Sequence, residues 1–235
     1  IHEPHTPFHV DPKLQKRFAE LGEKDSIYAA TLFHADFRIG QLLNALDRLE
    51  LSRNTLVIFS SDNGPARGAP DAPLTLGYDS ATGLGYGIGA AKGITGQRRA
   101  YKGALLEGGI GVPFIVRWPG KVSAGRVDET SILSAVDLLP TFCELAGIEL
   151  PDSYKPDGLS QVKALKGKGD SLRKKPLFWK IGASWPPRDS KPDHWVAYAV
   201  VDQQWKLCLN KDRDFYELFD LTKDPFETKD LSKSN

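Results

Sequence analysis

Apolar residues recur at every third or fourth position between Ser26 and Leu49, with charged and amide side chains at the positions between them. This period places the apolar side chains along one face of an α-helix. The pattern therefore predicts an amphipathic helix from Ser26, in which Asp25 or Ser26 caps the first turn.

Two short runs of continuous apolar residues follow a different pattern. Residues 54–61 (NTLVIFSS) and 111–120 (GVPFIVRWPG) are rich in β-branched and aromatic side chains. Because the first run comes directly after an amphipathic helix, we expect it to be a parallel strand buried on both faces, and we expect a second buried strand at 111–120. Residues 134–147 predict another helix, with Pro140 near its first turn and Gly147 at its end. Helices that alternate with buried strands indicate an α/β fold.

The pattern changes towards the C-terminus. Residues 163–175 (KALKGKGDSLRKK) indicate a solvated basic stretch. Three strand-like runs then follow without helices between them, at 194–201, 203–210 and 214–221. Successive strands of this kind predict a small antiparallel sheet. Its expected core residues are Trp205, Leu207 and Tyr216.

These patterns predict two domains. Residues 1–160 would form the α/β core, and residues 161–235 the antiparallel subdomain. The chain contains no methionine and opens on IHEPHTPF, so we expect it to be the later part of a longer protein. The core sheet would then have an open edge, and we expect these residues to be poorly stable when expressed alone.

The composition excludes some classes of function. Hydrophobic residues make up 40% of the chain and charged residues 26%, as in ordinary globular proteins. A net charge of +1 gives no electrostatic attraction to nucleic acid or to an anionic membrane. No apolar stretch reaches the roughly 18 residues that span a bilayer. Cys143 and Cys208 lie far apart, which argues against a disulfide framework or a thiolate metal site.

The first apolar run ends on polar chemistry, in the sequence SSDNGP. Ligands of open α/β sheets bind at the carboxyl ends of parallel strands, where Asp62 and Asn63 would lie. Carboxylate and amide oxygens suit Ca²⁺ or Mg²⁺, and Gly64 lets the chain turn away sharply. Taken alone, the pattern fits a plain Asp-Asn-Gly turn even better, because such turns are common.

Five motifs, which follow one another in a fixed order along the chain, favour the metal site over the plain turn. Together they resemble the later part of a type I sulfatase, the formylglycine-dependent family of the alkaline phosphatase superfamily, over nearly the whole chain. The resemblance implies the later half of an alkaline-phosphatase-like core sheet flanked by helices, followed by the small antiparallel subdomain. The motifs are EPHTPF (3–8), SSDNGP (60–65), YKGALLEGGIGVPFIVRWPG (101–120), SAVDLLPTFCELAGI (134–148) and ELFDLTKDPFETKDL (217–231).

The resemblance implies roles for four residues. Asp62 and Asn63 would be metal ligands, usually for calcium, with magnesium as the alternative. Lys102 would match the lysine that contacts the sulfate group, and His5 the histidine that contacts the sulfate or the leaving oxygen. The implied reaction is the hydrolysis of sulfate esters, most simply those of sulfated carbohydrates, in a periplasmic or secreted protein.

The family's nucleophile is a formylglycine made from Cys or Ser in a Cys/Ser-x-Pro-x-Arg motif. Its hydrate attacks sulfur and forms a covalent sulfate intermediate. The resemblance places that motif upstream of these residues, so we expect this chain alone to be inactive. The sequence SWPPR (184–188) matches the motif in form only, because it follows the Asp-Asn pair and its two prolines fit only a helix start.

Some features leave alternatives open. Gly111 stands where the family usually has arginine, and we expect Glu107 to orient its neighbours in a Gly-Gly turn. The segments 64–100 and 182–195 would border the substrate cleft, where Trp185 and Trp195 either stack on a sugar or pack in a core. A phosphate or phosphonate ester hydrolase of the same superfamily, or a non-catalytic protein that binds sulfated glycans, would share these motifs.

Overall fold

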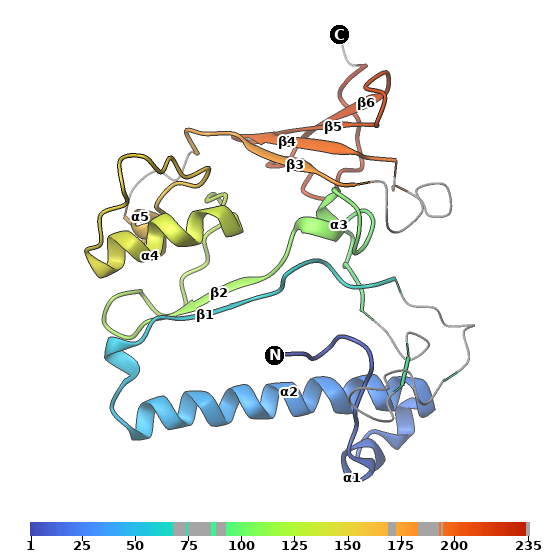
Figure 1. Cartoon of the computed structure of the whole chain (residues 1–235). Coiled ribbons are helices and arrows are strands. Elements are labelled where there is room, and N and C mark those ends of the chain that lie inside the picture. The colour runs from blue at the N-terminus through green and yellow to red at the C-terminus, as the bar shows by residue number, and fades with distance from the viewer. Residues whose placement is uncertain are drawn as a thin grey trace. The chain divides into compact units, whose positions relative to one another are not determined.

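The computed structural model describes residues 1–67, 74, 86–87, 93–168, 173–182, 193 and 195–233 (Figure 1). The chain divides into two compact units. One comprises Ile1–Ser52 with Pro65–Gly96, and the other comprises Arg53–Gly64 with Gln97–Asn235. A domain boundary at residue 160 stays a prediction.

The first unit is helical. It contains α1 (Pro12–Lys16), a 3₁₀ turn (Ala19–Leu21) and α2 (Glu23–Arg48). The predicted amphipathic helix is therefore confirmed, but it begins three residues before Ser26. The prediction of a side-chain cap is wrong, because Gly22 is the N-cap and the Ser26 hydroxyl donates to the Glu23 carbonyl instead, at 2.8 Å.

The core of this unit lies where the N-terminal segment meets the start of α2. Phe8 and Ile27 are fully buried, and the Phe8 ring packs edge-on to Tyr28 at 5.8 Å between centroids. None of the described helices is long and apolar enough to cross a membrane.

The second unit begins with a two-stranded ribbon. Strand β1 (Val57–Ser60) pairs with β2 (Phe114–Arg117) in antiparallel register, with Ile58 opposite Val116. Both predicted strands exist, but the expectation of a parallel strand buried on both faces is wrong. The apolar run indicates a strand suited to burial, yet it carries no information on which strand lies beside it or in which direction. Among the described residues, β1 and β2 form a sheet of two strands. Their side chains are not buried on both faces, since Phe59 and Ile115 are 44% and 59% exposed.

The predicted helix at 134–147 is confirmed. A 3₁₀ turn (Ala135–Asp137) leads into α4 (Leu138–Ala146), and Pro140 lies in the first turn of α4. Gly147 ends the helix with φ of 67°, a left-handed conformation that glycine adopts without strain.

The stretch at 163–175 is only partly solvated. The short helix α5 (Val162–Leu165) covers its start, and the side chain of Arg173 is only 1% exposed. Arg173 lies 2.6 Å from the Asp137 carboxylate, which is also buried. The expectation of a solvated stretch is wrong at Arg173, because a partner far away in sequence neutralises its charge.

The C-terminal strands form the predicted antiparallel sheet. Its order is β3-β4-β5-β6, and sequence reasoning missed β3 (Figure 1). The strands are β3 (Leu177–Lys180), β4 (Tyr198–Asp202), β5 (Trp205–Leu209) and β6 (Tyr216–Asp220).

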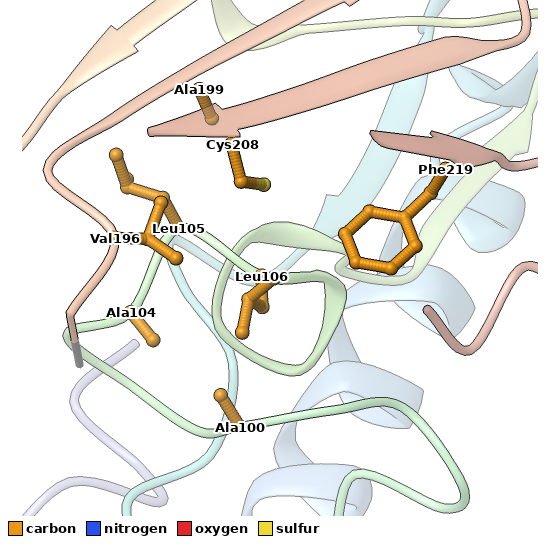
Figure 2. Packing of buried hydrophobic residues seen from close by; sticks show 8 residues of the cluster. All are labelled: Ala100, Ala104, Leu105, Leu106, Val196, Ala199, Cys208 and Phe219. Atoms are coloured by element: carbon orange, nitrogen blue, oxygen red, sulfur yellow. The ribbon is translucent and has the colours of Figure 1, made fainter. Parts of the chain in front are cut away.

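The core of this sheet lies on the face opposite to the one expected. Trp205 and Tyr216 are 42% and 50% exposed, and Leu207, on the same face, is half-buried. The buried face carries Ala199, Cys208 and Phe219, which pack against Leu105 and Leu106 (Figure 2). Hydropathy alone predicts the wrong face. The face of β5 that is buried carries the charged residue Lys206, so it looks less apolar than the outer face.

Candidate functional site

The predicted metal ligands follow directly after β1. The Ser61 hydroxyl donates to the Asn63 carbonyl at 2.8 Å, and the Asn63 side chain is half-buried while Asp62 is exposed. The next residue, Gly64, is buried and donates its N–H to the Gly109 carbonyl at 2.8 Å. This bond attaches the end of the Asp-Asn loop to the short helix α3 (Glu107–Ile110).

The contact between this loop and α3 requires glycine. A Cβ atom on Gly64 would lie 1.9 Å from the Gly108 carbonyl oxygen, far inside any real contact distance. The backbone of the loop and the backbone of α3 therefore meet without side chains between them, which fixes their separation tightly.

The segment that carries Lys102 packs against the same helix. The Gly108 N–H donates to the Arg99 carbonyl at 2.7 Å, and a Cβ on Gly109 would lie 2.2 Å from the Ala104 carbonyl oxygen. Lys102 itself is half-buried. The glycines of α3 thus join the Asp-Asn loop to the lysine segment, an arrangement that sequence reasoning missed although the Gly-Gly pair in EGGI was its signal.

A charge cluster lies at the first residue of α3 and consists of Glu107, Lys206 and Glu227. The Lys206 ammonium on β5 is fully buried and lies 2.8 Å from Glu107 Oε1 and 2.7 Å from Glu227 Oε1. The other oxygen of Glu227 accepts the Glu107 N–H at 2.7 Å. Glu107 therefore contacts a partner strand that the sequence did not identify, and the expectation that it orients its neighbours stays a prediction.

The charges of this cluster shift one another's pKa values. Burial alone would lower the pKa of Lys206, but the negative charges of Glu107 and Glu227 outweigh it and leave that pKa above its usual value. Burial raises the pKa of Glu227, and the neighbouring Lys206 ammonium only partly offsets this.

Arg99 fixes the other end of the lysine segment. Its guanidinium lies 2.7 Å from Asp193 and 2.8 Å from Glu217 on β6. Burial alone would lower the pKa of Arg99, but the hydrogen bonds to both carboxylates outweigh it and raise that pKa. The segment from Arg99 to Glu107 is therefore held at both ends by ion pairs to the C-terminal part of the chain.

The fourth predicted site residue, His5, belongs to the first compact unit, whereas Asp62, Asn63 and Lys102 belong to the second. The His5 side chain is exposed, its Nδ1 lies 2.6 Å from the Thr6 carbonyl oxygen, and its ring meets that of His2 edge-on at 5.8 Å.

The oxygens of Asp62 and Asn63 suit a hard divalent cation in type. Calcium takes about six to eight oxygen ligands, so this pair fits one part of a coordination shell. The described residues contain no group of three or more His, Cys, Asp or Glu side chains that could hold a metal ion.

Gly111 provides room for the Glu107 carboxylate. A Cβ atom at position 111 would lie 2.6 Å from Glu107 Oε2 and 2.7 Å from the Glu107 carbonyl oxygen. Any side chain at this position would therefore displace Glu107 or the end of α3. The difference from the family pattern thus affects the charge cluster directly.

Two further expectations concern the aromatic residues. Trp195 packs against the core cluster of the C-terminal sheet, and its ring meets Phe215 at 4.8 Å, which favours core packing. Trp185 and the SWPPR sequence lie outside the described residues, as does most of the segment 64–100.

Comparison with known families gives matches along the whole chain. Residues 1–148 match the family model described as Sulfatase. Residues 98–235 match the model described as N-sulphoglucosamine sulphohydrolase, C-terminal.

Curated relatives are sulfatases. The chain is 31% identical to the steryl-sulfatase of Mus musculus, over 97% of this chain and 36% of that protein. It is 27% identical to the N-acetylgalactosamine-6-O-sulfatase of Bacteroides thetaiotaomicron, over 87% of this chain and 38% of that protein. The chain thus spans little more than a third of the length of these relatives.

Solved structures include a similar fold. The crystal structure of Ps i-CgsB matches with a TM-score of 0.74 and 27% identity, over 99% of this chain and 45% of that one. The same protein is also known in complex with k-i-k-neocarrahexaose, at 26% identity. These matches agree with the alkaline-phosphatase-like α/β core and small antiparallel sheet predicted from the sequence.

Proposed function

Since the chain belongs to the sulfatase family, we propose that the protein hydrolyses sulfate esters and that this chain supplies the part of its active site around Asp62, Asn63, Lys102 and His5. The observation that carries the proposal is the attachment of both the Asp-Asn loop and the Lys102 segment to α3. Three of the four proposed residues thereby belong to one continuous backbone network.

The charges of these residues suit the reaction. A sulfate ester carries one negative charge, which moves towards the leaving oxygen as the S–O bond breaks. The Lys102 ammonium would stabilise that charge at the sulfate oxygens. His5 would donate a proton to the leaving oxygen or hold the ester by a hydrogen bond.

Asp62 and Asn63 would supply two oxygen ligands to a divalent cation, calcium or magnesium. When bound, the cation would supply further electrostatic stabilisation of the developing charge. Members of the family in general use a metal and a formylglycine nucleophile. Neither the remaining metal ligands nor the nucleophile is assigned to residues of this chain.

Sulfated carbohydrates are the proposed substrate class. The name of the Bacteroides relative and the oligosaccharide in the Ps i-CgsB complex support this class, whereas the name of the mouse relative points to steroid sulfates. For a protein that acts on external glycans, a periplasmic or secreted location is proposed.

The test is an assay of the full protein that the gene encodes. It should be run on an aryl sulfate, sulfated saccharides, a steroid sulfate and a phosphate monoester. Lys102→Ala should lower kcat/KM about 100- to 1,000-fold, the effect of removing one donor to a developing oxyanion. Lys166→Ala, which removes another half-buried lysine of the same unit, should leave it unchanged.

Two further measurements complete this test. His5→Ala should lower activity while His9→Ala should not, and the opposite result would move the role to His9. Chelation should abolish activity, and titration of Ca²⁺ against Mg²⁺ would identify the metal. Turnover of the phosphate ester alone would favour the phosphatase alternative, and glycan binding without turnover would favour the non-catalytic one.

A further inference from the structure

The segment that carries Lys102 is tied to the C-terminal part of the chain at both of its ends. Arg99, three residues before Lys102, pairs with Asp193 and Glu217. Glu107, five residues after it, pairs with Lys206.

Glu227 contacts both ends of this segment. Its carboxylate accepts the N–H of Glu107, and its carbonyl oxygen lies 3.4 Å from the Arg99 guanidinium. Glu107 is the first residue of α3, so its N–H has no partner within the helix and needs one outside it. Glu227 supplies that partner from 120 residues further along the chain.

The charges of the cluster are costly for a purely structural contact. Lys206 and Glu227 are fully buried, and removing such charges from water opposes folding. Apolar side chains of similar volume often hold two elements together equally well. Ion pairs differ from apolar contacts in fixing direction as well as distance, which suits an element whose position must be exact to within a fraction of an ångström.

We propose that Lys206 and Glu227 are positioning residues, which hold α3 and the Arg99–Glu107 segment so that Lys102 is aimed at the sulfate group. The inference rests on the proposed function, because it concerns the same lysine. It adds that the C-terminal sheet acts on catalysis through this segment. Neither Lys206 nor Glu227 touches the substrate.

A double-mutant cycle in the full protein tests this directly. Lys206→Met should lower kcat about 10- to 100-fold, the range expected from a displacement of about 1 Å. In the Lys102→Ala background the same substitution should lower kcat less than about threefold, because the group that it positions is already absent. A merely structural role for Lys206 would not produce this non-additivity.

A stability control separates positioning from unfolding. Arg173→Met removes another fully buried cation of the same unit, with no contact to the segment, and should leave kcat unchanged where the variant is folded. If Lys206→Met does not fold, Glu227→Gln replaces it, since it keeps an oxygen that can accept the Glu107 N–H. It should lower kcat about tenfold, again only when Lys102 is present.

The outcomes distinguish the two proposals. Equal losses in both backgrounds, or no loss in either, would overturn the positioning role and leave the sulfatase assignment intact. No loss on Lys102→Ala itself, in a protein that hydrolyses sulfate esters, would overturn the role of Lys102 and with it the inference.

Discussion

Two buried ion clusters in the second unit are built from the same kinds of side chain but hold different parts of the chain. Asp137 and Arg173 pair at 2.6 Å, and Asp137 also accepts the N–H groups of Ser134 and Leu159. In the other cluster one cation, Lys206, faces two carboxylates. The first cluster caps the 3₁₀ turn in which Asp137 itself lies, whereas the second holds the start of a helix far away in sequence.

This difference indicates how a buried charge comes to matter for activity. Each carboxylate fixes the backbone segment whose N–H group it accepts. Its effect on activity therefore depends on whether that segment carries a proposed site residue. Asp137 fixes the start of the 3₁₀ turn before α4 and the segment at Leu159, which contain none of the proposed site residues. Glu227 fixes Glu107, at the end of the segment that contains Lys102. Both clusters should therefore affect stability, but only the second should affect activity.

The largest expected effect on stability comes from Lys206→Met. The substitution leaves Glu107 and Glu227 facing each other without a cation, and Glu227 is fully buried. Breaking a buried ion pair costs about 3–5 kcal/mol, and we expect a value at the upper end because two carboxylates are affected. Urea unfolding of the full protein measures this cost, and a loss below about 1 kcal/mol would mean that the cluster contributes little.

The next effect in size is that of Arg173→Met. Asp137 would lose its cation but keep the hydrogen bonds from Ser134 and Leu159, so we expect a cost of about 3 kcal/mol. Activity at a temperature where the variant is folded should match that of the wild type. A selective fall in kcat would contradict the comparison, because no proposed site residue contacts this cluster.

The fold was largely predictable from the sequence, since its signals are local. The period of α2, the proline and glycine of α4 and the strand-like runs of the C-terminal sheet each identify an element from its own residues. The pairing of β1 with β2 was not predictable in this way, because strand direction depends on residues more than fifty positions apart. The buried face of β5 was also missed, since the charge of Lys206 is compensated only in the folded chain.

The candidate site was predictable only in part, for a related reason. The motifs identified Asp62, Asn63, Lys102 and His5 by resemblance, and their roles remain proposals. The sequence predicts a turn where the helix α3 joins three of them, although its Gly-Gly pair indicates a close backbone contact. Glu227 lies within the motif at 217–231, but only its distances to Glu107 and Lys206 show which segment it holds.

Alkaline pH should also separate the two clusters. The pKa of Lys206 is higher in the folded protein than in the unfolded chain, so its stabilising effect is complete below about pH 10.5 and is lost as pH rises through the folded value. An arginine keeps its charge throughout this range. The stability of the wild type and of Arg173→Met should therefore fall together as the pH rises above about 10.5, while that of Lys206→Met should fall less. Parallel curves for all three proteins would show that folding does not raise the pKa of Lys206.

The smallest expected effect comes from Trp205→Ala, next to Lys206 on the same strand. Hydropathy alone ranks Trp205 as the more important residue, but its side chain lies on the outer face of the sheet and is 42% exposed. We expect a loss of about 0.5–1 kcal/mol, in the range of partly exposed positions, against the several kcal/mol expected for Lys206→Met. Urea unfolding of the two variants in parallel makes the comparison. If Trp205→Ala cost more than Lys206→Met, the outer face of the sheet would be a covered surface in the full protein, and the ranking of the two faces would be reversed.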